Sequence, residues 1–194
     1  MPTCLECFCE SGYDGRGLQS LVDRCHPDFI CEAETCSIYS PGPVGDGEAI
    51  AFILIHPLHY DKERDVIVPD AFQELTKRDL STLRVSKATK SQADETKGQL
   101  IQRGRDKIPP QLRLVDEVCT AEVSKIRSAC NDAGERMMAV YDTALEAVPA
   151  HASVFTNADV LENKKRRKVV RRLVHEAFSK NRVSYSDFVS NLPS

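Results

Sequence analysis

The sequence predicts an α+β protein with a small cysteine-rich module at its N-terminus and a long basic helix near its C-terminus. Six of the eight cysteines lie within the first 36 residues. Short apolar runs alternate irregularly with helical patterns, which favours an α+β domain over a doubly wound sheet. Seven cations occupy the nine positions from Lys164 to Arg172, in a segment with helical spacing.

The length and composition indicate a globular protein of ordinary make-up. A chain of 194 residues can bury one core and carry a small appended module. A hydrophobic content of 41% and a charged content of 28% fit this class. The segment Met1–Glu6 has neither the basic start nor the apolar run of a signal peptide, and no apolar run approaches the length of a membrane span. We therefore expect a cytoplasmic protein without a membrane partner.

Residues 1–40 are predicted to form a metal-binding module. Cys4 and Cys7 are spaced so that two thiolates reach one tetrahedral ion from a single turn, and Cys31 and Cys36 form a looser second pair. Paired soft ligands of this kind are typical of structural zinc, which folds polar segments. The candidate ligands are Cys4, Cys7, Cys9, Cys25, His26, Cys31 and Cys36. The alternatives are an iron–sulfur cluster, reduced and packed thiols, or disulfides, which would require an oxidising compartment.

A linker rich in Pro and Gly, residues 40–47, separates this module from an α+β domain of residues 48–194. The apolar run Ala49–Ile55 predicts a buried strand, and residues 66–68 predict a short edge strand. Pro69 begins a short helix, residues 80–86 form a second strand, and residues 91–103 form a polar helix that starts with a capping box.

The remaining elements follow from apolar spacing. Apolar residues three and four apart predict a helix over residues 112–130, with Cys119 and Cys130 on its buried face. Residues 137–141 and 151–155 predict two further strands. A long helix capped by Asn157 or Asp159 is expected to run to about Ser179, followed by a small helix around Phe188.

Four side chains form a candidate catalytic cluster: His56, His59, Arg84 and His151. The first two follow a buried strand, on a connecting segment where functional groups are often displayed. If the strands are neighbours, the imidazoles and the guanidinium would converge in one cleft. Histidine can then act as acid, base or metal ligand, and arginine can hold a phosphate or carboxylate.

The charge is unevenly distributed along the chain. Residues 1–48 carry nine acidic and two basic side chains, whereas residues 159–194 carry nine basic and four acidic ones. The basic cluster comprises Lys164, Lys165, Arg166, Arg167, Lys168, Arg171 and Arg172. Such a cluster can bind phosphates with strong salt dependence, can dock an acidic protein surface, or can be a solvated face.

The sequence thus predicts a zinc-stabilised binding or accessory protein that acts in a protein complex or homo-oligomer, with nucleic acid as a further possible partner of the basic helix. The alternative is a small hydrolase or transferase that uses the His/Arg cluster. A pocket that gathers these four side chains would favour the enzyme.

Overall fold

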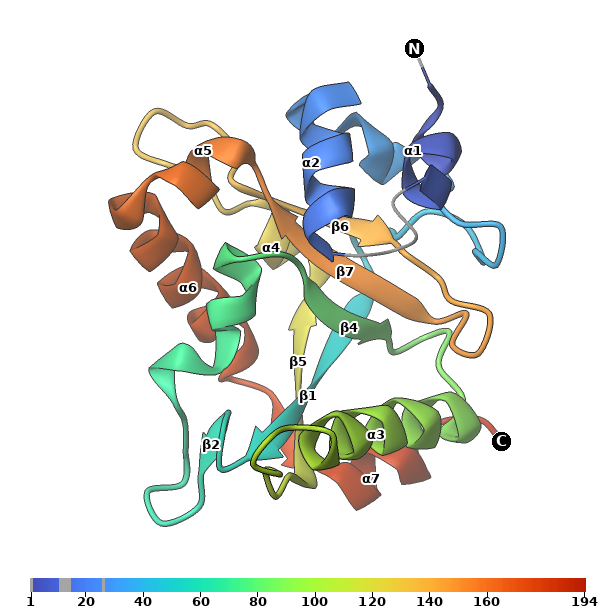
Figure 1. Cartoon of the computed structure of the whole chain (residues 1–194), viewed down its shortest axis with the longest axis vertical. Helices are drawn as coiled ribbons and strands as arrows, with labels where there is room; N and C mark the ends of the chain where they lie inside the picture. Colours follow the sequence, from blue (N-terminus) through green and yellow to red (C-terminus); the bar gives the residue numbers. More distant parts are fainter. Residues whose placement is uncertain (1, 11–14, 26) are drawn as a thin grey trace.

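The computed structural model describes residues 2–10, 15–25 and 27–194. A six-stranded antiparallel sheet of strand order β6-β7-β4-β1-β5-β8 forms the middle layer, and helices cover both of its faces (Figure 1). Strands β2 and β3 form a separate two-stranded sheet. This arrangement confirms the predicted α+β class. In the described part of the chain, no helix has both the length and the apolar character that a membrane crossing requires.

The element bounds give the order along the chain. The strands are β1 Ala49–His56, β2 Tyr60–Asp61, β3 Val66–Ile67, β4 Leu80–Arg84, β5 Leu114–Glu122, β6 Met138–Asp142, β7 His151–Thr156 and β8 Arg182–Ser184. The α-helices are α1 Cys4–Glu10, α2 Gly15–Cys25, α3 Lys90–Arg105, α4 Val123–Arg127, α5 Ala158–Glu162, α6 Lys164–Phe178 and α7 Tyr185–Ser190. Two 3-10 helices are η1 Pro27–Ala33 and η2 Pro69–Thr76.

The sheet separates two sides of the core because successive side chains of a strand point to opposite faces. On β1, Ile50 and Phe52 face a cluster that contains α6 and η2. Ala51 and Ile53 face a second cluster that contains α3 and α7. The predicted strand at residues 49–55 is therefore confirmed as a central strand with both faces covered.

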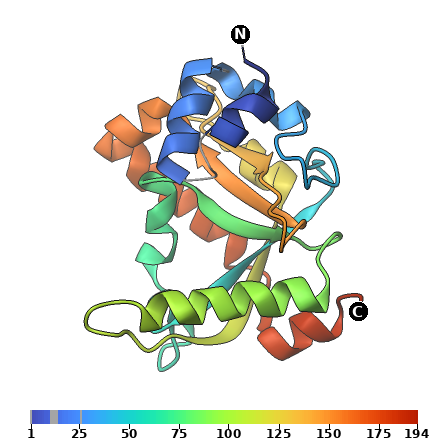
Figure 2. The same ribbon diagram turned by 45° about the vertical axis from the view of Figure 1, so that its right-hand side comes forward.

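The N-terminal helices occupy the same face of the sheet as α3 and α7, but at the other end (Figure 2). Phe8 of α1 lies edge-on to Tyr141 of β6, with ring centroids 5.6 Å apart, and also contacts Phe155 of β7. Leu18, Val22 and Phe29 complete this third cluster. Residues of the cysteine-rich segment thus pack on the sheet, and the predicted division into residues 1–40 and 48–194 stays a prediction.

Glu32 attaches η1 to the edge strand β6. Its carboxylate accepts a hydrogen bond of 2.6 Å from the Val140 N–H and one of 2.7 Å from Arg127, and it also pairs with Arg136. Arg127 in turn donates to the Val140 carbonyl at 3.3 Å. An edge strand with unpaired backbone groups can pair with a strand of another chain. Glu32 and Arg127 bind the N–H and the carbonyl of Val140 and so protect this part of the edge.

The predicted helix over residues 112–130 is wrong. Residues 114–122 form β5, which pairs with β1 along its length, and only residues 123–127 are helical. Cys119 is buried on β5, whereas Cys130 is exposed beyond α4. Side chains four apart can share a face in a strand as well as in a helix, and the central strand β1 required a second neighbour.

The predicted single C-terminal helix is divided at Asn163. Asn157 caps α5 through a 3.0 Å hydrogen bond from the Val160 N–H, as expected from its side chain. Asn163 is extended and caps α6 by accepting from Lys165 N–H at 2.9 Å. The basic cluster therefore begins a helix of its own, with cations at its N-terminal end.

Candidate functional site

The seven cations of α6 divide into two groups according to their contacts. At 3.6 residues per turn, Arg166 and Arg167 turn toward the side of the helix that carries buried Val170 and Val174. Arg166 pairs with Asp159 of α5, and Arg167 donates to the Leu161 carbonyl at 2.7 Å. These two arginines therefore fasten α6 to α5.

Of the other five cations, Arg171 is half-buried beside η2, and the remaining four are exposed. Lys164, Lys165 and Lys168 are exposed, and no ion pair among the described residues uses them. Arg171 lies 3.1 Å from Asp70 of η2, and Arg172 lies 3.9 Å from Glu176. Helix α6 thus presents three lysines without a counter-charge next to two oriented guanidinium groups. We call the side chains of Lys164, Lys165, Lys168, Arg171 and Arg172 the basic face.

A cavity of about 310 Å³ opens at the C-terminal end of the basic face. Its lining residues are Asp70, Lys168, Arg171, Arg172 and His175. His175 is fixed because its Nε2 donates to the Ile67 carbonyl at 3.2 Å. A carbonyl can only accept, so this contact places a proton on Nε2. The cavity gathers nitrogen donors around one carboxylate and is suited to an anionic group.

The four side chains of the predicted catalytic cluster fall into two separate pairs. Arg84 and His151 lie on adjoining strands, since the Arg84 N–H donates to the Ala150 carbonyl at 2.8 Å. His56 and His59 lie at the far end of β1, about 20 Å along the strand from the residue that pairs with Arg84. His151 pairs with Leu83, so the side chains of Arg84 and His151 point to opposite faces of the sheet, and both lie far from His56 and His59. Their catalytic role stays a prediction.

Both members of the distal pair are bound to the backbone. His56 Nδ1 donates to the Tyr60 carbonyl at 2.9 Å, and His59 Nδ1 accepts from the Ile55 N–H at 3.3 Å. The His59 ring lies against Phe52, with centroids 5.1 Å apart. Burial and the nearby charge of Arg113 lower the pKa of His59 to about 4, so its imidazole is neutral at neutral pH.

His151 ends a chain of hydrogen bonds that the sequence analysis missed. Its Nδ1 lies 2.9 Å from both the carbonyl and the hydroxyl of Thr143. The Thr143 hydroxyl donates to Ser153 Oγ at 2.9 Å, and Ser153 donates to Asp79 at 2.6 Å. This chain fixes the tautomer with the proton on Nδ1, and burial lowers the pKa of His151. Hydroxyl residues on strands carry no sequence signal that would have identified their partners.

The Arg84 side chain forms part of a buried network of charged groups. Its guanidinium donates two hydrogen bonds to Glu48, at 2.6 and 3.0 Å, and two more to the carbonyls of Gly42 and Pro43. Asp142 lies 3.7 Å from the same guanidinium, and its other oxygen accepts from Ser40. Four of the five N–H donors of Arg84 thus hold the connecting segment 40–48 against the sheet, and the remaining one is on Nη1, which lies 3.7 Å from Asp142.

Burial raises the pKa of Asp142 to about 7, although the charge of Arg84 opposes this shift. The ordinary value is 3.8, so between about pH 4 and pH 7 the folded chain binds more protons here than the unfolded chain. The contribution of Asp142 to the free energy of unfolding should therefore fall as the pH rises through this window, by at most about 1.4 kcal/mol per pH unit. Glu48 acts in the opposite sense between its lowered pKa and the ordinary value of 4.5, where its contribution to the free energy of unfolding rises with pH.

Replacing Asp142 with asparagine should flatten this pH dependence. Urea unfolding of the wild-type and Asp142→Asn chains at intervals between about pH 4 and pH 8 measures it. We expect the difference in stability between the two chains to change across the window and to become constant above it. A difference that is independent of pH would show that Asp142 titrates near its ordinary value.

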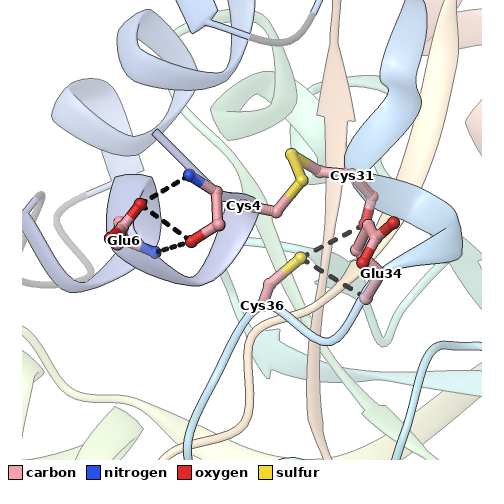
Figure 3. The surroundings of a disulfide bond; sticks show 6 residues. Cys4, Glu6, Cys31, Glu34 and Cys36 are labelled. Carbon is pink, nitrogen blue, oxygen red and sulfur yellow. Dashed lines mark hydrogen bonds between the residues drawn. A yellow bond between two sulfur atoms is a disulfide. The ribbon is translucent and has the colours of Figure 1, made fainter. Parts of the chain in front are cut away.

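The cysteine cluster contains a disulfide between Cys4 and Cys31, whose Cα atoms are 5.5 Å apart (Figure 3). The Cys36 Sγ donates to the Cys31 carbonyl at 3.2 Å, and burial raises the pKa of this thiol. Cys7 is buried in the same region, whereas Cys9 is exposed. The side chain of Cys25 and the whole of His26 lie outside the described residues.

Metal binding by this segment stays a prediction. Among the residues that the structure describes, no three His, Cys, Asp or Glu side chains are grouped so that they could hold a metal ion. The Cys4–Cys31 disulfide uses two of the predicted zinc ligands. A zinc or iron–sulfur site built on these thiols would therefore require the reduced chain.

The fold and the site define a class: an α+β protein with a central antiparallel sheet and a cationic cavity on a surface helix. Comparison with protein-family models, with curated proteins and with solved structures finds no match for this chain. The assignment of a function therefore rests on the side chains themselves.

Proposed function

We propose that the chain is an accessory binding protein that docks an acidic segment of a partner protein on the basic face of α6. The observation that carries this proposal is the set of unpaired lysines leading into a cavity lined by Arg171 and Arg172. An acidic segment would neutralise the lysines and place one carboxylate in the cavity. Two guanidinium groups can bind such a carboxylate with charge-assisted hydrogen bonds.

The electrostatics of α6 alone are unfavourable, which supports a role in binding. The N-terminal end of a helix carries a partial positive charge, so lysines in the first turns are destabilising there. Lys164 and Lys168, and Lys168 and Arg172, are four residues apart and repel each other by a few tenths of a kcal/mol per pair. These three side chains are exposed, so a bound anion would offset the cost.

Protein is favoured over nucleic acid by the composition of this surface. Phe178 of α6 is buried, so its ring cannot stack on a base, and the other ring of the helix, the His175 imidazole, is fixed by its hydrogen bond to the Ile67 carbonyl. Asp70 forms part of the cavity wall and can accept a hydrogen bond from a backbone N–H, a donor that a sugar–phosphate backbone lacks. A polypeptide carries donors as well as carboxylates and can satisfy both kinds of group.

Substituting the three unpaired lysines tests the proposal. The variant Lys164→Gln, Lys165→Gln, Lys168→Gln should bind a fluorescent peptide of alternating glutamate and aspartate about tenfold more weakly than the wild type, because each exposed pair contributes up to about 1 kcal/mol. Fluorescence anisotropy at low salt measures the affinity, and the difference should shrink as salt is added.

A matched control removes the same charge elsewhere. Lys77, Lys125 and Lys180 are exposed and lie outside the basic face, so their replacement by glutamine should leave binding of the peptide nearly unchanged. If both triple variants lost the same affinity for the peptide, the loss would depend on net charge alone, and the proposal would be contradicted. Tighter binding of mixed-sequence DNA than of the peptide, with a steep salt dependence, would instead identify nucleic acid as the partner.

A further inference from the structure

A second cavity, of about 450 Å³, lies at the end of β1 and is mainly apolar. Its lining residues are His56, Pro57, Leu58, Gln111, Leu112 and Leu114. The three leucines are among the large apolar side chains that remain exposed, and Leu112 is 76% exposed. Ile108, in the same connecting segment, is almost fully exposed. Apolar side chains gathered around a concavity mark a site of interaction rather than ordinary surface.

The walls of this apolar cavity are fixed by backbone contacts. The Gln111 N–H donates to the Gly104 carbonyl at 3.0 Å, and Arg113 donates to the Leu100 carbonyl at 3.1 Å. Gly104 is required at this point, because a Cβ there would lie 2.6 Å from the Gln111 carbonyl oxygen. On the opposite wall, His56 is bound to Tyr60. A preformed cavity of this kind costs little ordering on binding.

The two cavities lie on opposite edges of the β2–β3 hairpin. His56 of the apolar cavity donates to the Tyr60 carbonyl, and His175 of the cationic cavity donates to the Ile67 carbonyl. Tyr60 and Ile67 are directly paired. In the neighbouring pair, His59 and Val68, the Val68 N–H donates to the His59 carbonyl at 3.0 Å. The Tyr60 and Ile67 pair is therefore non-hydrogen-bonded, and its carbonyls point away from each other.

This geometry sets the distance between the cavities. The Cα atoms of a non-hydrogen-bonded pair are about 4.5 Å apart, and each carbonyl extends outward toward one imidazole. The two imidazoles then lie on the order of 15 Å apart, a distance that about five extended residues span. The β2–β3 hairpin lies between the two imidazoles, so this distance is the minimum span of a peptide that crosses the hairpin from the cationic cavity to the apolar one.

We propose that the partner segment carries, about five residues from its acidic run, an apolar side chain that binds in the cavity formed by Leu58, Leu112 and Leu114. This inference rests on the proposed docking of an acidic segment on α6. The charges beside the apolar cavity agree with it. Arg105 and Lys107 are exposed, and no ion pair among the described residues engages them. Asp106, between them, accepts from Gln102 at 2.7 Å.

Three synthetic peptides test the inference. The first has a short run of glutamates alone, the second adds a serine–glycine spacer of about five residues and a terminal leucine pair, and the third shortens that spacer to about two residues. The second peptide should bind about tenfold more tightly than the first, because burial of a leucine side chain is favourable. The third peptide cannot reach the cavity and should lose this gain.

Variants of the apolar cavity give the matching test on the protein. Leu112→Ser should abolish the tenfold gain of the second peptide and leave the affinity of the first unchanged. Because Leu112 is largely exposed, this substitution should not affect folding. Ile38 is 67% exposed and lies outside both cavities, so Ile38→Ser serves as the control with no expected effect.

The outcomes separate the inference from the function on which it rests. Equal affinities for the first and second peptides, with the α6 triple variant still weakening both, would overturn the bipartite site and leave the docking proposal standing. Binding of none of the three peptides would overturn both. A gain for the second peptide that Leu112→Ser leaves unchanged would place the apolar contact elsewhere and overturn the inference.

Discussion

Replacing Arg84 with methionine is expected to lower the free energy of unfolding by about 3–5 kcal/mol, a large share of the stability of an ordinary domain. Arg84 is only 2% exposed. Methionine fills much of the same volume but supplies neither charge nor donors. The variant would leave Glu48 and the buried Asp142 without their counter-charge, and the carbonyls of Gly42 and Pro43 without donors. Urea unfolding followed by circular dichroism measures the loss.

A surface arginine provides the control for this prediction. Arg64 is exposed and lies 3.7 Å from Asp61, so Arg64→Met should change the stability by about 0.5 kcal/mol or less. Loss of Arg84 raises the pKa of Asp142 further, so adding Asp142→Asn to Arg84→Met should recover part of the loss at alkaline pH, where the Asp142 carboxylate would otherwise be ionised and unpaired. A loss below about 1 kcal/mol for Arg84→Met would mean that water solvates this network and that Arg84 does not hold segment 40–48.

Removing the disulfide between Cys4 and Cys31 is expected to cost about 3–4 kcal/mol in the chain-entropy model. The bond closes a loop with a sequence separation of 27 and connects α1 to η1. Opening the loop restores freedom to the unfolded chain, whereas Phe8 and Phe29 keep their apolar contacts in the folded one. Reduction with dithiothreitol and the double variant Cys4→Ser, Cys31→Ser should therefore lower the urea midpoint to the same extent, because both open this loop.

Thiol and metal analysis of the same samples decides between the disulfide and the predicted zinc site. Dithiothreitol should lower the stability of the wild type and leave the double serine variant unchanged. Cys119→Ser, at a buried cysteine outside this cluster, should keep the sensitivity to the reductant. A reduced wild-type chain that holds about one zinc ion and loses stability with a chelator would instead support the four-thiolate site. Bound zinc in a chain purified without reductant would contradict the disulfide, because the two states compete for Cys4 and Cys31.

The sequence by itself determined those elements whose signals are local. The apolar run at residues 49–55 has one satisfactory environment, a central strand covered on both faces, and it became β1. Asn157 and Pro69 marked helix starts that the structure contains, because caps and proline act within one turn. The concentration of cations at Lys164–Arg172 was also visible at once.

Only the tertiary structure decided the elements and sites that depend on distant partners. Residues 114–122 have apolar spacing compatible with a helix, but pairing with β1 made them a strand. The predicted catalytic side chains do not form one cluster. Arg84 pairs with Glu48 and Asp142, whereas His56 and His59 bind backbone groups at the far end of β1. The sequence does not distinguish Arg166 and Arg167 from the cations of the basic face. The difference lies in their contacts with α5, which the fold brings next to them. Burial and strand pairing depend on contacts between segments that are far apart in sequence. Local sequence patterns therefore do not predict them.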